Sequence, residues 1–355
     1  MRLGKTLSLA EYEPVLAPLP RSVLWVVVVC VSLAAPAPAG SARNTTFPSG
    51  ATMVAKIPVP HASGALAVGL GGVWAMKDDG STLYRIDPRR NVVVARIALR
   101  TPKTCPTFPQ SCGEVAVGDG AVWVAEPAAN AVERVDPRTN AIAASIPVGK
   151  QPAGVAVSPD AVWVASLRGP SVSRIDPKTN QVVASIAVGP AKPCCGDHIT
   201  VAWGDGGVWV TLEKAGAVAR LDPTSKRVST IPVGWFRFGQ PCGGLLVTPA
   251  AVWAGGAHCP TSSGYAVVIR IDPHAEKVVG AVKGVRSPIG LVLASGSLWI
   301  ADLDAKSVER VDPASGRIVG KLVVGGVPIG LVAGYRALWV GDGSGHVLRL
   351  APAHN

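Results

Sequence analysis

The sequence predicts an all-β protein, a seven-bladed β-propeller made of four-stranded blades. A tryptophan preceded by Val or Leu, and an Arg-x-Asp-Pro turn, both recur with a period of roughly 40–45 residues, which is the spacing of propeller blades. The tryptophans are Trp74, Trp123, Trp163, Trp209, Trp253, Trp299 and Trp339. The turns contain Arg85, Arg134, Arg174, Arg220, Arg270 and Arg310, and the last copy is altered to Arg349-Leu350-Ala351-Pro352. We find no segment with helical periodicity, which argues against a helical repeat protein.

One copy of the repeat, Ala121–Asn140, shows how the pattern specifies strands and turns. Trp123 and the two valines beside it point to opposite faces, as expected for a strand that is buried on both faces. Asp136-Pro137 suits the first two positions of a type I turn, because the carboxylate accepts backbone N–H groups and the proline φ is already set. Asn140 tolerates a left-handed conformation, so the next strand, Ala141–Val148, can run back.

Each unit contains four strands in a fixed order. The innermost is a short apolar stretch, the second carries the tryptophan, the third ends in Asp-Pro, and the fourth is a run of the type Val-Val-Ala-x-Ile. The innermost strands include Glu114–Val117, Val155–Val157, Ile199–Ala202 and Leu245–Val247. The last unit lacks a fourth strand, whereas Met53–Val59 has that pattern and precedes the first unit. We therefore expect this N-terminal strand to join the last blade and close the ring, which leaves no long open edge.

The repeated side chains have structural interpretations. A tryptophan that recurs in every blade is expected to fill the space between blades, because a ligand site would not be repeated seven times. Each Arg-x-Asp pair lies on one face of its strand and is interpreted as a structural salt bridge or a turn brace.

The N-terminal region differs from the repeat. Arg21, the apolar run Ser22–Ala35 and the small residues Ala37-Pro38-Ala39 have the order of a secretory signal. We predict a signal peptide over residues 1–39, a flexible tether over 40–50 and the propeller over 51–355, and therefore a secreted, extracytoplasmic protein. An uncleaved membrane anchor is the alternative, although the apolar run is short for a full span.

The chain carries a formal net charge of +11. Such a charge favours anionic partners, such as a cell-wall polymer or a phospholipid. No Lys/Arg run and no nucleic-acid-binding motif is found, which argues against specific nucleic-acid recognition.

Six cysteines follow the predicted signal peptide, and an even number in an exported protein favours disulfides. All six fall in loops that emerge on one face of the predicted disc. We expect Cys105–Cys112 and Cys242–Cys259 bridges, while Cys194 and Cys195 form a vicinal bridge or remain reduced. No C-x-x-C pair is present, which argues against a cysteine metal site.

The same face gathers polar residues that are not part of the repeat, and repeat proteins place such departures on their binding surface. The candidates are His61, His198, His258, Lys77, Asp78, Glu126, Arg168, Glu213, Asp302, Asp304 and Asp342. An aromatic cluster, which includes Trp235 and Phe238, either stacks against a ligand or covers a groove between blades.

The repeat resembles two propeller groups over residues 51–352. Ser173–Asn180 looks like the turn of YVTN-type repeats, and Gln151–Val157 followed by Val162-Trp163-Val164 is similar to a blade of the streptogramin (virginiamycin B) lyase-like propellers. The second resemblance implies ring opening of a cyclic depsipeptide by elimination, with a histidine base and Mg²⁺ held by acidic residues.

The residues that match that chemistry in kind are Glu126, Glu213, His198 and His61, but they do not form the lyase-like motif in adjacent blades. Other catalytic motifs, such as G-x-S-x-G, are absent from the sequence. The leading interpretation is therefore a monomeric binding platform for a protein, a wall polymer or a small molecule, without a cofactor. A Mg²⁺-dependent C–O lyase is the alternative.

Overall fold

The computed structural model describes residues 51–100, 113–189, 199–233, 243–256 and 267–352. The chain divides into two compact units, residues 1–41 and 42–355, and the description concerns the second. All of the cysteines, together with His198, His258, Trp235 and Phe238, lie outside the described residues. Among the described residues, no helix has the length and apolarity needed to cross a lipid bilayer.

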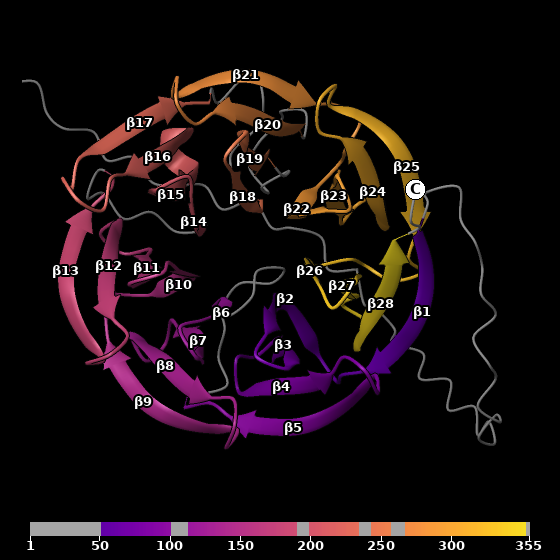
Figure 1. Cartoon of the computed structure of the whole chain (residues 1–355), viewed down its shortest axis with the longest axis horizontal. Coiled ribbons are helices and arrows are strands. Elements are labelled where there is room, and N and C mark those ends of the chain that lie inside the picture. Colours follow the sequence, from indigo (N-terminus) through magenta and orange to yellow (C-terminus); the bar gives the residue numbers. More distant parts are fainter. Residues whose placement is uncertain (1–50, 101–112, 190–198, 234–242, 257–266, 353–355) are drawn as a thin grey trace, which may run out of the picture. The chain divides into compact units, whose positions relative to one another are not determined.

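The described strands form seven antiparallel sheets of four strands, arranged in a ring (Figure 1). Blade 1 contains β2 (Ala62–Gly69), β3 (Gly72–Lys77), β4 (Thr82–Asp87) and β5 (Val92–Ala98). Blade 2 contains β6 (Val115–Gly118), β7 (Ala121–Glu126), β8 (Ala131–Asp136) and β9 (Ala141–Pro147). Blade 3 contains β10 (Pro152–Val157), β11 (Val162–Ser166), β12 (Ser171–Asp176) and β13 (Gln181–Ala187). Blade 4 contains β14 (Val201–Gly204), β15 (Gly207–Leu212), β16 (Ala217–Leu221) and β17 (Val228–Pro232), with the one-turn 3-10 helix η1 (Glu213–Ala215) after β15.

Blade 5 contains β18 (Leu245–Thr248), β19 (Ala251–Gly256), β20 (Val267–Asp272) and β21 (Lys277–Val282). Blade 6 contains β22 (Pro288–Ala294), β23 (Ser297–Asp302), β24 (Ser307–Asp312) and β25 (Arg317–Val323). Blade 7 contains β26 (Gly330–Gly334), β27 (Ala337–Gly341), β28 (His346–Pro352) and, as its outermost strand, β1 (Ala51–Pro58).

Blade 7 confirms the predicted closure of the ring. β1 pairs antiparallel with β28, in a register that joins Ala51 to Pro352 and Pro58 to His346. The inner strand of blade 1, β2, packs against both β6 and β26, so the ring is continuous across this junction. We call the boundary between blades 7 and 1 the seam.

The alternation of strand directions gives the ring two faces. The lower face carries the turns between the first and second strands of each blade (inner turns) and between the third and fourth (outer turns). The upper face carries the loops after the second strands and the lead-in loops, which connect one blade to the innermost strand of the next.

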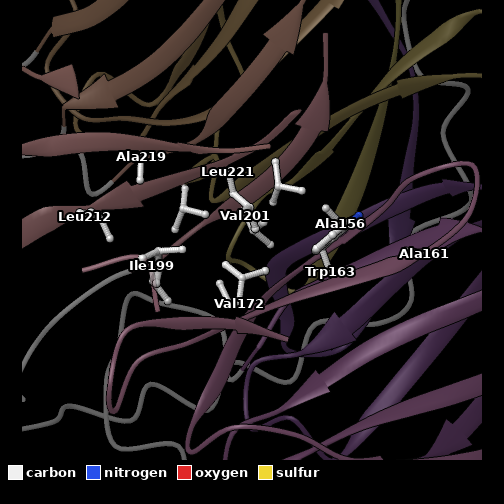
Figure 2. Packing of buried hydrophobic residues seen from close by; sticks show 13 residues of the cluster. Ala156, Ala161, Trp163, Val172, Ile199, Val201, Leu212, Ala219 and Leu221 are labelled. Atoms are coloured by element: carbon white, nitrogen blue, oxygen red, sulfur yellow. The ribbon is translucent and has the colours of Figure 1, made fainter. Parts of the chain in front are cut away.

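The tryptophans fill the space between blades, as predicted. Each is at most 2% exposed. The cluster around Trp163 shows the arrangement, because it joins blade 3 residues such as Val172 to Ile199 and Leu221 of blade 4 (Figure 2). Six of the indole N–H groups donate to an acceptor five residues earlier in the same blade. Trp74 Nε1, for example, donates to Gly69 O at 3.1 Å in the inner turn of its own blade.

The arginine and the aspartate of each Arg-x-Asp pair make different contacts. The interpretation of the pair as a salt bridge is therefore wrong, and the interpretation as a turn brace is confirmed for the aspartate. Asp87 Oδ1 accepts the N–H groups of Arg89 and Arg90 at 2.8 and 3.1 Å. These hydrogen bonds hold the pKa of Asp87 below its ordinary value. The arginine instead covers the tryptophan of its own blade, with Arg85 Cζ 5.1 Å from the Trp74 ring centroid.

The guanidinium group then reaches the outer turn of the next blade. Arg85 Nη1 donates to Asn140 Oδ1 at 2.9 Å, and Arg134 Nη1 donates to Asn180 Oδ1 at 3.1 Å. Arg349 makes the same contact across the seam, to Asn91 Oδ1 at 3.1 Å and Pro88 O at 3.0 Å. We call this contact the arginine clasp. It ties the outer turns of blades 1, 2 and 3, and the turn of blade 1 to blade 7, on the lower face.

Candidate functional site

A pocket opens on the upper face at the seam. Its volume is about 390 Å³, which is within the range of small-molecule sites. The lining residues come from blade 1 and from the loops of blade 7: Pro60, His61, Ala62, Asp78, Ile329, Gly343, Ser344 and Gly345. The pocket therefore depends on the ring closure made by the N-terminal strand.

His61 and Asp78 form the polar wall of this pocket. His61 has a left-handed backbone with φ of 56°, and its carbonyl accepts the N–H of Asp78 at 2.7 Å. This contact brings His61 Nδ1 to 3.6 Å from Asp78 Oδ2, while the two side chains remain 70% and 48% exposed. The pair thus offers a ring nitrogen and a carboxylate to the solvent side of the pocket.

The opposite wall is the glycine-rich loop Gly341–His346, which is organised by Asp342. The Asp342 side chain is fully buried and accepts the N–H groups of Ser344 and His346 at 2.9 and 3.0 Å, and the Ser344 hydroxyl at 2.7 Å. Lys56 Nζ of β1 lies 3.8 Å from the same carboxylate. A single buried carboxylate therefore fixes the loop and connects it to the closing strand.

A second set of polar contacts stiffens the loop that follows β3. Lys77 Nζ donates to Asp79 Oδ2 at 2.5 Å, and the N–H and hydroxyl of Ser81 donate to Asp79 Oδ1. Partial burial raises the pKa of Asp79, but these hydrogen bonds outweigh it and lower the pKa to about 2. The hydrogen bond to Asp79 in turn raises the pKa of Lys77. Both groups are charged at neutral pH, beside the pocket.

The lead-in loop of blade 3 repeats the geometry of His61. Gln151 has φ of 54°, and Leu167 donates its N–H to the Gln151 carbonyl at 3.0 Å. The Gln151 side chain accepts from Arg168 Nε at 3.0 Å, and Arg168 remains exposed. Pairing of a lead-in side chain with the loop after the second strand is thus a feature of the upper face, and both Asp78 and Arg168 take part in it.

The predicted acidic candidates have different environments. Glu126 is buried at the end of β7, opposite Ala131. Leu212 occupies the equivalent position of blade 4, opposite Ala217, so Glu213 lies one residue beyond it in η1 and the two glutamates are not equivalent.

Asp302 does match the position of Glu126, but it acts as a brace. Its buried carboxylate accepts the N–H groups of Arg286, Ser287 and Ala305 at 2.7 to 3.1 Å. Asp304 is exposed in the following turn. Within the part of the chain that the structure describes, no three His, Cys, Asp or Glu residues come together as a metal site.

Sequence reasoning missed the carboxyl group of Glu114 at the centre of the ring. Glu114 Oε2 accepts the N–H of Val155 at 3.3 Å, and the carboxyl also bonds the side chain of Thr200 in blade 4. Burial raises the pKa of Glu114 to about 8, despite these two hydrogen bonds, which lower it.

The signal for Glu114 was present in the register of the innermost strands. The residue two positions before the partner of the tryptophan is small in the other blades: Ala65, Gly154, Thr200, Gly244, Gly290 and Gly330. Glu114 is the large exception. A Cβ added to Gly154 would lie 3.3 Å from Glu114 Oε2, so the glutamate side chain passes over that glycine to reach blade 4.

No protein-family model and no curated protein matches this sequence. Solved structures do match its fold. Hydrazine synthase of Kuenenia stuttgartiensis aligns with a TM-score of 0.67 and 16% identity, over 90% of this chain and 100% of that chain. Virginiamycin B lyase from Staphylococcus aureus gives 0.61 and 17%, over 84% and 98%. BamB from Moraxella catarrhalis gives 0.56 and 15%, over 83% and 84%. The chain is therefore a β-propeller with the architecture of the lyase, and the varied names of these proteins show that the fold does not specify one activity.

Proposed function

We propose that the protein is an extracytoplasmic recognition module that binds its ligand in the seam pocket of the upper face. The pocket itself is the observation that carries this proposal, because it combines a suitable volume with exposed polar groups on a fixed frame. The N-terminal sequence pattern supports export. Loss of residues 1–39 from the secreted chain would demonstrate it.

The two walls of the pocket have complementary properties. The Asp342-braced loop is held by several hydrogen bonds, so ligand binding there requires little ordering of the protein. The His61–Asp78 wall presents exposed groups that exchange hydrogen bonds with a ligand. Asp78 supplies the negative charge in the lining, and a ligand with an amine, an amide or a hydroxyl donor suits it best.

The test is a ligand-observed NMR screen of the full chain with small amines, amino-acid amides and sugars. Asp78→Asn removes the charge of the pocket wall and keeps its size. Asp304→Asn makes the same change at an exposed position in blade 6 and is the matched control. We expect pocket ligands to bind about tenfold more weakly to the Asp78 variant, since a charge-assisted hydrogen bond contributes roughly 1.5–3 kcal/mol, and equally well to the control. Equal binding to both variants would contradict the proposal.

The lyase alternative is favoured by the fold likeness to virginiamycin B lyase. The described residues do not fit the Mg²⁺ site that this chemistry implies, because no three His, Cys, Asp or Glu side chains among them come together. Asp302 and Asp342 use their oxygens on backbone donors, and His61 Nδ1 faces Asp78. Elimination opens the depsipeptide ring without a change of mass. Chromatographic retention of a streptogramin B, incubated with protein and Mg²⁺, therefore distinguishes an enzyme from a recognition module.

A further inference from the structure

The lower face is divided by charge. The inner turns of blades 2, 3 and 4 each contain an aspartate, namely Asp119, Asp160 and Asp205. The inner turns of blades 7 and 1 contain instead Tyr335-Arg336 and Leu70. The repeat does not fix the residue type in the inner turns. The aspartates of blades 2, 3 and 4 therefore distinguish their side of the ring from the side of blades 7 and 1.

Outer turns carry cations around the whole ring, for example Lys226 and Arg227 in blade 4, but on this side no inner-turn aspartate offsets them. Blade 1 carries the consecutive arginines Arg89 and Arg90, and blade 6 carries Arg317. These three side chains and Arg336 are exposed. None of the four forms a salt bridge within the described part of the chain, although Arg89 and Arg90 interact at longer range with Asp87 of their own turn. By contrast, Arg138 of blade 2 lies 3.7 Å from Asp136. We call Arg89, Arg90, Arg317 and Arg336, with Leu70 and Tyr335, the basic sector.

The members of the basic sector belong to blades that are in contact. The inner strands β22, β26 and β2 pack consecutively, and a Cβ added to Gly334, beside Tyr335, would lie 2.2 Å from Val68 in β2. The arginine clasp of Arg349 ties blade 7 to the outer turn that carries Arg89 and Arg90. The four cations therefore lie on one side of the lower face, in the neighbouring blades 6, 7 and 1.

Two exposed apolar side chains belong to the inner turns of blades 1 and 7. Leu70 is 39% and Tyr335 is 38% exposed, and both have a left-handed backbone, with φ of 51° and 52°. Leucine and tyrosine at the tips of turns, flanked by arginines, suit the interface between lipid headgroups and acyl chains.

We infer that the basic sector docks on an anionic phospholipid surface, with the phosphate groups contacting the arginines and with Leu70 and Tyr335 entering the interface. This goes beyond the sequence expectation, in which the membrane contact is made only by an uncleaved N-terminal segment. It leaves the upper face, with the seam pocket, directed away from the lipid.

The test is sedimentation of the full chain with vesicles of phosphatidylcholine alone or mixed with phosphatidylglycerol. The difference between the two vesicle types is the readout, because the apolar N-terminal run contributes to both. Arg89→Glu with Arg90→Glu reverses two charges in the sector. Arg138→Glu with Lys178→Glu makes the same charge change in the outer turns of blades 2 and 3, where both side chains are exposed.

We expect the phosphatidylglycerol-dependent affinity to fall at least about 25-fold in the sector variant, since each basic residue near an anionic surface contributes about fivefold, and to fall much less in the control. Leu70→Asn with Tyr335→Asn keeps the left-handed turns and should also weaken binding. Equal losses in the two charge variants, or equal binding to both vesicle types, would overturn the inference. Binding of the wild-type chain to heparin but not to anionic vesicles would overturn the assignment to lipid.

Discussion

The lower and upper faces of the propeller follow different rules. On the lower face, the same residue types carry out the same contacts from blade to blade, through the stacked arginine and the capped outer turn. On the upper face, Asp342, Asp302 and the Lys77–Asp79 pair brace three loops in three different ways. The repeated contacts of the lower face hold the blades together. The loops of the upper face can therefore differ in sequence, and some of them form the seam pocket.

The exceptions on the lower face support this conclusion, because each has a local cause. The outer-turn position that accepts the clasp is Asn140 or Asn180 in blades 2 and 3, but it is Lys226 in blade 4. Arg174, which would face that lysine, turns back to Asp160 of its own blade at 2.7 Å. Arg310 donates to Ser297 Oγ because blade 7 has no outer turn, its fourth strand being β1.

The largest expected effect comes from breaking the frame of the lower face. Trp123→Ala removes a fully buried indole together with the ring beneath Arg134. We expect a loss of about 3–5 kcal/mol in the free energy of unfolding, because the cavity adds to the lost burial. Urea denaturation measures it. Asp304→Ala, at an exposed site on the upper face, should change stability by less than about 0.5 kcal/mol, and a comparable loss there would contradict the division between the faces.

A smaller effect is expected at Glu114, the large side chain at the centre of the ring. Its folded pKa of about 8 lies above the ordinary value of 4.5, so the folded protein keeps a proton that the unfolded chain releases between these two pH values. This residue therefore makes the wild-type protein less stable as pH rises through that window, by about 1.4 kcal/mol for each pH unit crossed.

Glu114→Gln should remove this penalty. We expect the variant to be close to wild type in thermal stability at pH 5 and more stable by a few kcal/mol at pH 9, because each pH unit between the two pKa values contributes about 1.4 kcal/mol. Thermal unfolding across this pH range measures the difference. A constant difference between the two proteins at all pH values would show that the Glu114 carboxyl is not desolvated in the folded state.

The contrast between the faces also explains what could be read from the sequence. The blades, the turns and the closing strand were predictable because Trp123, Asp136-Pro137 and their copies repeat one local solution. The clasp was missed because Arg85 and Asn140 are 55 positions apart and meet only across blades. His61 and Asp78 were named separately, but the pocket also needs Ser344, which ring closure brings from the other end of the chain.

The smallest effect is expected from Lys226→Asn, which tests why Arg174 makes no clasp with blade 4. Lys226→Asn gives blade 4 the acceptor that blades 2 and 3 have, at a left-handed position (φ of 59°) that suits asparagine. The new amide oxygen then competes with Asp160 for the Arg174 guanidinium, so the contribution of Asp160 to stability should fall. In a double-mutant cycle, Asp160→Ala should cost up to about 1 kcal/mol in the wild-type background, because the pair is exposed, and less in the Lys226→Asn background. If Asp160→Ala reduces stability equally in both backgrounds, Arg174 binds Asp160 even when an asparagine acceptor is present. Lys226 would then not be the reason why Arg174 makes no clasp.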